Sequence, residues 1–65
     1  MNLIEGLQIE INRCKDLLNE YKSIGPPGAF AMAFISQEIR IAERAISTGD
    51  TLEMLRIFNQ LKECN

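Results

Sequence analysis

The segment from Ser23 to Ile46, SIGPPGAFAMAFISQEIRIAERAI, decides how the rest of the chain must fold. It opens with two prolines between glycines, a combination that predicts a turn and bars a continuous helix from the preceding segment. From Ala29 to Ile35 no side chain carries a charge, a hydroxyl or an amide. A helix that is apolar around its whole circumference must be surrounded by other parts of a protein. We therefore expect this segment to provide both core and a surface for self-association.

The chain has 65 residues, and a domain of this size buries only about 60% of the surface that its unfolded chain exposes. Residues 1–65 are therefore expected to form a single helical domain with a small stability margin. Disulfides, a metal ion or oligomerisation usually supplement such a margin. Because the sequence has no His and two Cys, neither a metal site nor a cofactor is expected. A homo-oligomer is the supplement that remains.

The seven basic and nine acidic residues give a formal charge of −2. Without a basic patch, duplex nucleic acid is not an expected partner. No apolar run reaches the ~18 residues that a membrane span needs, so no membrane association is expected. The opening MNLIEG lacks the pattern of an export leader, and we expect a cytoplasmic protein in which Cys14 and Cys64 are unpaired.

Two longer helices are predicted at about residues 2–23 and 28–47. The connection between them is short, so we expect an antiparallel helical hairpin. Asn2 is predicted to cap the first helix together with Glu5. The apolar stripe of the first helix, at alternating spacings of three and four, consists of Ile4, Leu7, Ile11, Cys14, Leu18 and Tyr21.

A shorter third helix is predicted at about residues 51–63. Gly49 is expected to end the second helix in the left-handed conformation, and Asp50 to cap the third with Glu53. The side chains expected to be buried from this helix are Met54, Leu55, Ile57, Phe58 and Leu61. Period-two alternation, which would predict a strand, is absent from the sequence, so the expected fold class is all-α.

The second helix carries two apolar stripes. The first consists of Met32, Ile35, Ile39, Ala42 and Ile46, and the second of Phe30, Phe34, Ile41 and Ala45. Only one of them can pack on the first helix, so the other must meet the third helix or another subunit. Phe30, Phe34 and Ile41 are therefore predicted to form an oligomer interface. Ile9 lies opposite the stripe of its own helix, and near Gly6 it is predicted to add a further contact surface.

The sequence shows no catalytic constellation. Without His, a hydrolase would need paired carboxylates, an activated Ser or Cys, or a metal ion, and no such pattern is visible. We expect no enzymatic activity and no catalytic residues.

The turn Gly25–Gly28 and the start of the second helix form the candidate ligand site. Free backbone amides there, together with the helix dipole, favour an anion such as phosphate. A ring for stacking and a cation lie one helical turn earlier, and two arginines spaced four apart are expected to come from a second subunit. The predicted ligand-binding residues are Tyr21, Lys22, Gly28, Ala29, Arg40 and Arg44. The alternative is an ordinary interhelical turn, which the lack of a P-loop GK[ST] sequence favours.

The string Tyr21-x-x-Ile24-Gly25-Pro26-x-Gly28-x-Phe30 resembles a family of small all-helical proteins of bacteriophages and prophages. Further matching positions are Ala45-Ile46-x-x-Gly49-Asp50 and Met54-Leu55, so the resemblance covers roughly residues 17–62. In size and helical make-up the chain is also similar to phage sponge proteins, oligomers that trap nucleotide second messengers of bacterial immune systems between subunits.

The likeness to sponge proteins implies sequestration of an anionic nucleotide-like signal at an oligomer pocket in the host cytoplasm, which would counter host defence. An aromatic ring, basic residues and backbone amides hold the ligand in such proteins. The alternative is a protein-interaction module in which Phe30, Phe34 and Ile41 bind a host or phage protein and inhibit or regulate it.

Overall fold

The computed structural model describes residues 2–64, which form three α-helices, one short 3₁₀ turn and no strand. Helix α1 spans Leu3–Ile24, the 3₁₀ turn η1 spans Pro26–Gly28, α2 spans Ala29–Thr48 and α3 spans Thr51–Lys62. The predicted all-α fold with three helices is confirmed, and each observed helix end lies within one residue of its predicted position. Of the helices in this part of the chain, none combines the length and apolar character needed to cross a bilayer.

The residues that begin and end the helices act as their chemistry predicts. The side chain of Asn2 accepts a hydrogen bond from the amide of Glu5 at 2.9 Å, and that of Asp50 accepts one from the amide of Glu53 at 3.1 Å. Gly49 has a φ of 72°, in the left-handed region, and its amide donates to the carbonyl of Ile46 at 3.2 Å. These contacts satisfy backbone groups that a helix end leaves without a partner.

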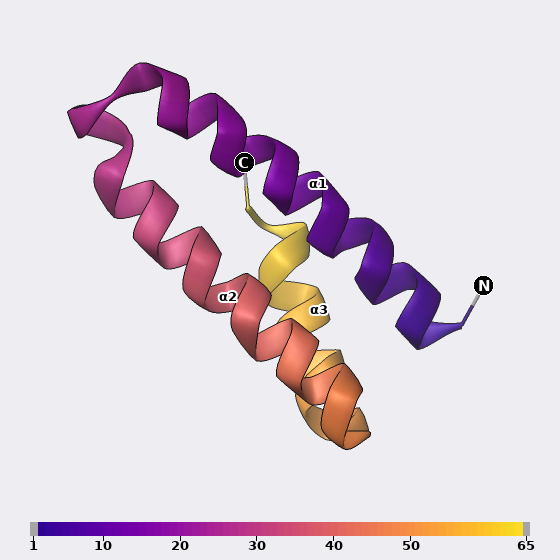
Figure 1. Cartoon of the computed structure of the whole chain (residues 1–65). Coiled ribbons are helices and arrows are strands. Elements are labelled where there is room, and N and C mark those ends of the chain that lie inside the picture. The colour runs from indigo at the N-terminus through magenta and orange to yellow at the C-terminus, as the bar shows by residue number, and fades with distance from the viewer. Residues whose placement is uncertain (1, 65) are drawn as a thin grey trace.

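Figure 1 shows α1 and α2 joined through η1 at one end of the molecule, while α3 runs from the end of α2 towards the middle of α1. At 1.5 Å per residue, α3 is about 18 Å long and α1 about 33 Å. Helix α3 therefore covers only part of the α1–α2 pair. We call the part that it covers the three-helix end, and residues 17–35 the turn end.

The core is built from side chains of all three helices. The buried apolar residues are Leu7, Ile11, Cys14, Ile35, Ile39, Ala42, Ala45, Met54, Ile57, Leu61 and Cys64. Both thiols are free, as expected. Burial, followed by the neighbouring thiol of Cys64, raises the pKa of Cys14 to about 11. Cys14 is therefore a protonated core residue at neutral pH.

Two residues that were predicted to be buried are exposed. Ile4 is 46% exposed because Leu3, which is partly buried, shares the core-facing side of α1 with Leu7, whereas Ile4 is rotated away by about 100°. Leu55 is also 46% exposed. In α3 the core face passes through Met54, so its neighbour Leu55 points to solvent.

Arg13 fixes the position where α3 ends. Its guanidinium donates one hydrogen bond to the carbonyl of Cys64 at 2.8 Å and another to the carbonyl of Leu61. Its Nε also pairs with Glu10 at 3.0 Å. A cation at the carboxyl end of a helix satisfies its last carbonyls and interacts favourably with the helix dipole. The end of α3 is thereby tied to the middle of α1, which determines the shape of the groove described below.

Candidate functional site

The turn between α1 and α2 uses its own amides. The amide of Gly28 donates to the carbonyl of Gly25 at 2.9 Å, and the amide of Ala29 donates to the carbonyl of Pro26. The prediction that both amides are free to meet a phosphate is therefore wrong. The prolines wind the segment into a 3₁₀ turn, and the i to i+3 hydrogen bonds of that turn occupy the amides of Gly28 and Ala29.

Gly28 has a packing role. It is buried, and a Cβ placed on it would lie 2.7 Å from the carbonyl oxygen of Tyr21. Only a residue without a side chain lets the turn approach the backbone of α1 so closely. The glycine in the quoted motif is thus explained by the contact between η1 and α1. Ala29 next to it is exposed.

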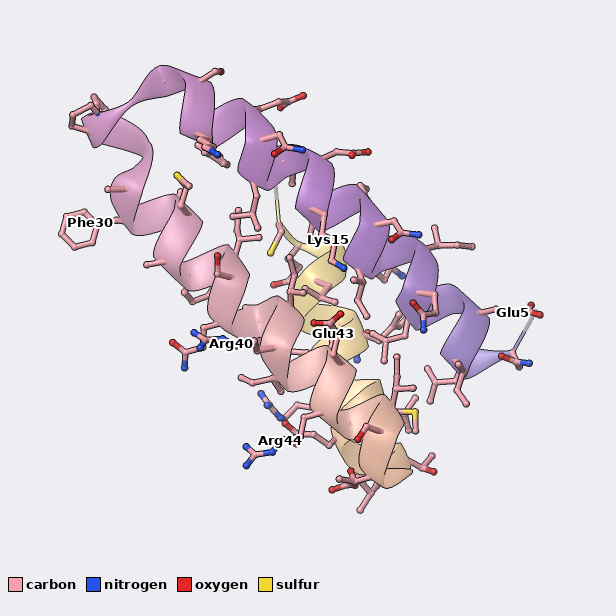
Figure 2. All side chains as sticks on the ribbon, in the orientation of Figure 1. Glu5, Lys15, Phe30, Arg40, Glu43 and Arg44 are labelled. Carbon is pink, nitrogen blue, oxygen red and sulfur yellow. The ribbon has the colours of Figure 1, made fainter. Side chains whose placement is uncertain are left out.

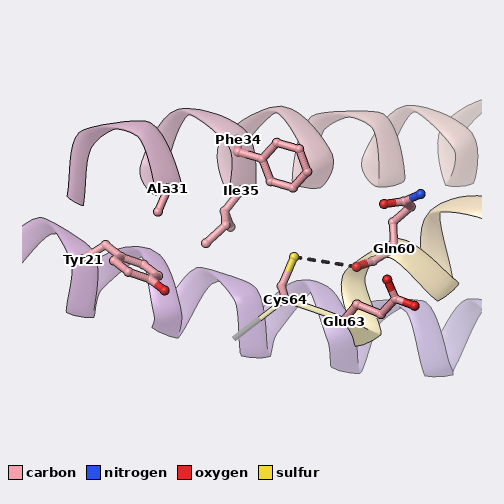
Figure 3. A pocket seen from close by; sticks show the side chains of 7 residues that line it. All are labelled: Tyr21, Ala31, Phe34, Ile35, Gln60, Glu63 and Cys64. Atoms are coloured by element: carbon pink, nitrogen blue, oxygen red, sulfur yellow. Dashed lines mark hydrogen bonds between the residues drawn. The ribbon is translucent and has the colours of Figure 1, made fainter. Parts of the chain in front are cut away.

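A groove of about 290 Å³ lies where α3 stops short of the turn. Its lining residues are Tyr21 from α1, Ala31, Phe34 and Ile35 from α2, and Gln60, Glu63 and Cys64 from the end of α3. Figure 3 shows the ring of Tyr21 at one end of the groove and the side chains of Gln60 and Glu63 at the other. The thiol of Cys64 lies between them and donates to the carbonyl of Gln60 at 3.7 Å. Lys22 follows Tyr21 but is exposed outside this groove.

The groove has an acidic rim. Among residues 2–64, Glu63 is the one charged side chain that lines the groove, and no Lys or Arg of that range lines it. The last carbonyls of α3 are already occupied by the guanidinium of Arg13, which binds those of Leu61 and Cys64. The carboxylate of Glu63 is therefore the charged group on the rim, and it favours hydrogen-bond donors. Within one chain, the predicted stacking residue Tyr21 therefore does not lie beside groups that would bind a phosphate.

Arg40 and Arg44 lie on the opposite side of α2. Figure 2 shows both projecting from the side of the helix that faces away from α1, together with Phe30. Both arginines are exposed, and neither takes part in an ion pair within residues 2–64. Arg40 is twelve residues from Gly28, about 18 Å along the helix. One chain therefore does not bring the predicted arginines to the turn.

Two other cations, Lys15 and Arg56, form ion pairs within residues 2–64. Lys15 of α1 pairs with Glu43 of α2 at 3.5 Å (Figure 2), and Arg56 pairs with Glu53 within α3. This pairing lowers the pKa of Glu53. By contrast, Arg40 and Arg44 on the outer side of α2 form no ion pair within residues 2–64, although Arg44 lines a pocket together with Asp50 and Glu53.

The residues predicted to form the oligomer interface differ in their exposure. Phe30 is 92% exposed and Phe34 57% exposed, whereas Ile41 is only partly buried. Ala45, from the same predicted stripe, is buried in the core. We define the outer stripe of α2 as Phe30, Phe34, Gln37, Arg40, Ile41 and Arg44. Among these, the apolar members are exposed or partly exposed, so the stripe is available for contact.

The further contact surface predicted at Ile9 and Gly6 has one exposed residue. Ile9 is 56% exposed, but Gly6 is buried within the chain. The two residues therefore do not share an exposed surface.

Gln60 and Glu63 were missed by the sequence reasoning. Gln60 lies within the last turn of α3 and Glu63 is its C-cap residue, and no local pattern marks either of them. They line the same groove as Tyr21 because α3 ends beside α1, where Arg13 binds its last carbonyls. The two hydrogen bonds of Arg13 join it to residues that are 48 and 51 positions away in the chain. A local sequence pattern does not reveal contacts over such a separation.

The chain matches no protein-family model, no curated protein and no solved structure. The resemblance to phage proteins therefore remains a prediction from the quoted motif. Within residues 2–64, no group of three or more Cys, Asp or Glu side chains is arranged to hold a metal ion.

Proposed function

We propose that the protein is a small binding protein that self-associates through the outer stripe of α2 and sequesters an anionic, nucleotide-like signalling molecule between its subunits. In a phage-infected cell such a protein counters host defence. The observation that carries this proposal is the division of the outer stripe into two exposed halves. Phe30 and Phe34 make an aromatic half near the turn, and Arg40 and Arg44 make a cationic half farther along.

A surface with these two halves is complementary to itself. Phe30 and Arg44 each lie seven residues from Gln37, on opposite sides of it. Antiparallel pairing of two α2 helices about Gln37 therefore places the Arg44 of each copy level with the Phe30 of the other. A guanidinium over an aromatic face contributes about 0.5 to 2 kcal/mol. The resulting contact has two-fold symmetry, which is the commonest symmetry of soluble oligomers.

The same pairing explains how the dispersed ligand residues would meet. The arginines of one copy come to the turn end of the other copy, where Tyr21 and Lys22 lie. Arginine presents several N–H donors in a planar fork that fits phosphate oxygens. The antiparallel hairpin of α1 and α2 thus supplies the ring from one subunit and the phosphate ligands from the next.

The alternative is a module that binds a host or phage protein through the same stripe and inhibits or regulates it. The engaged amides of Gly28 and Ala29 favour this alternative, because they remove one class of phosphate ligand. An exposed aromatic pair on a helix is also a common anchor for a protein partner.

Self-association is tested by sedimentation velocity or light scattering at micromolar concentration. We expect the wild type to be a dimer or larger. Phe30→Lys should give monomers, because the new ammonium group meets Arg44 of the other copy and the ring is lost. Leu52→Lys is the matched control, since Leu52 is 80% exposed on α3, outside the stripe. A monomeric wild type, or equal dissociation by both variants, contradicts the proposed interface.

Ligand binding is tested by calorimetry with a panel of cyclic and ADP-ribose-type nucleotides. Arg44→Ala should weaken binding roughly ten- to a hundredfold, which is the effect of losing one charge-assisted hydrogen bond. Arg56→Ala, which removes an arginine paired within α3, is the control. Equal losses in the two variants would indicate an effect of bulk charge. If no nucleotide binds, the protein-interaction alternative takes its place.

A further inference from the structure

The acidic groove between Tyr21 and the end of α3 has no part in the proposed phosphate contacts. Its floor is apolar, with Ile35 buried at 4% exposure. Rings of Tyr21 and Phe34 lie on its walls, and the amide of Gln60 and the carboxylate of Glu63 lie on its rim. Its volume of about 290 Å³ is close to the ~300 Å³ at which small-molecule sites begin.

We propose that this groove binds the base of the sequestered nucleotide, and that the base is guanine. The inference rests on the proposed function, because it names the ligand class of the same assembly. Base stacking on an aromatic side chain contributes about 1 to 3 kcal/mol and is open to every base. The stacking surface therefore supplies affinity, and the polar rim must supply the choice of base.

The rim selects adjacent hydrogen-bond donors. An ionised carboxylate only accepts hydrogen bonds, and its two oxygens can accept two parallel N–H groups. Guanine offers such a pair in its ring N1–H and its exocyclic amino group. Adenine and cytosine each place an acceptor nitrogen beside their amino group, and uracil flanks its single N–H with two carbonyls. Glu63 therefore matches guanine alone among the common bases.

The position of Glu63 supports this role. It follows α3 as the C-cap residue, next to Cys64, whose carbonyl Arg13 holds at 2.8 Å. Glu63 forms no ion pair within residues 2–64, so its carboxylate is available. The amide of Gln60 on the same rim has N–H donors that suit the O6 acceptor beside guanine N1–H.

The groove is continuous with the outer stripe of α2. Phe34 belongs to both, since it lines the groove and is 57% exposed. Phe34 and Arg40 each lie three residues from Gln37, on opposite sides. In the antiparallel pairing, Arg40 of the other copy is thus level with Phe34 along the helix axis.

The inference is tested on the wild-type chain by NMR titration with guanosine and inosine, which differ only in the exocyclic amino group. Tyr21 is the single tyrosine, so its ring signals need no assignment by mutation. Guanosine should shift these signals and bind roughly ten- to a hundredfold more tightly than inosine. Glu63→Gln should abolish that preference. Glu20→Gln removes the same charge from an exposed position outside the groove and should preserve it.

Equal binding of guanosine and inosine, a stronger response to adenosine, or shifts caused by choline in place of guanosine would overturn the inference. Unshifted Tyr21 signals at millimolar guanosine would do the same. Guanosine has no phosphate, so its binding does not depend on Arg40 or Arg44. Nucleotide binding without a base preference therefore refutes the guanine site alone, whereas guanosine binding that a phosphate does not strengthen refutes the proposed anion site alone.

Discussion

The two ends of this molecule differ in how they are held together. At the three-helix end Leu7, Ile57 and Leu61 are completely buried. At the turn end Phe30 is 92% exposed and Tyr21 only partly buried. The difference follows from the length of α3, which ends near the middle of α1 (Figure 1). Core burial is therefore concentrated at the three-helix end, whereas the aromatic half of the outer stripe, Phe30 and Phe34, is exposed at the turn end.

Backbone geometry replaces side-chain burial at the turn end. Gly25 has a φ of 89°, in the region that favours glycine, and Gly28 packs directly on the backbone of α1. These contacts need no large core. They allow the apolar side chains of the first turns of α2 to remain at the surface while the turn itself is well defined.

The largest expected effect is at the three-helix end. Ile57→Ala removes a completely buried side chain and should lower the free energy of unfolding by about 2 to 5 kcal/mol. Ile24→Ala is the matched change at the turn end, where Ile24 is 58% exposed, and should cost about 0.5 kcal/mol or less. Urea denaturation of both variants measures the difference. Similar losses would show that the two ends are not distinct.

The next effect tests the backbone contact of the turn end. Gly28→Ala forces a methyl group against the carbonyl oxygen of Tyr21, 2.7 Å away, and neither backbone can yield easily. We expect a loss of roughly 1 to 3 kcal/mol in the free energy of unfolding. Ala33→Ser also adds one heavy atom, at an exposed position of α2, and serves as control. An unchanged stability of Gly28→Ala would remove the packing explanation for this glycine.

The same division separates what the sequence predicts from what it does not. Helix ends depend on residues three or four positions apart, so Asn2, Gly49 and Asp50 could be identified from their chemistry alone. Whether the turn amides are free could not be predicted without knowing that two prolines and a glycine wind into a 3₁₀ turn. The same residues could form either an open helix N-terminus, whose free amides bind an anion, or a closed turn, whose amides are already occupied.

The groove shows a different limit. Tyr21 was predicted as a stacking residue from its place before the turn, and the structure puts it in a groove wall. Its neighbours there come from the end of α3, whose position depends on the hydrogen bonds of Arg13 to carbonyls about fifty residues away in the chain. Contacts between backbone carbonyls and a distant arginine leave no periodic trace in a sequence. For this reason the position of Glu63 on the rim of the groove followed only from the structure.

The smallest expected effect lies where the two ends meet, at Cys14. Its pKa is raised to about 11 from an ordinary value of 9.0, mainly because ionisation would place a charge in the core. Below pH 9 the thiol is protonated in both the folded and the unfolded chain and has no influence on the pH dependence of stability. As the pH rises from 9 towards 11, the unfolded chain loses this proton while the folded chain keeps it, so folding becomes less favourable. At pH 10 the loss amounts to roughly 1 kcal/mol.

The measurement is urea denaturation at pH 8 and pH 10 for the wild type and Cys14→Ala. The variant has a lower stability at pH 8 because it lacks a buried sulfur, so the comparison is between the two changes with pH. Titratable groups that do not interact with Cys14 are common to both proteins and cancel in that difference. The wild type should lose more stability than the variant on going to pH 10. If both lose the same amount, the thiol ionises as easily in the folded chain as in the unfolded one, and burial does not raise the pKa of Cys14.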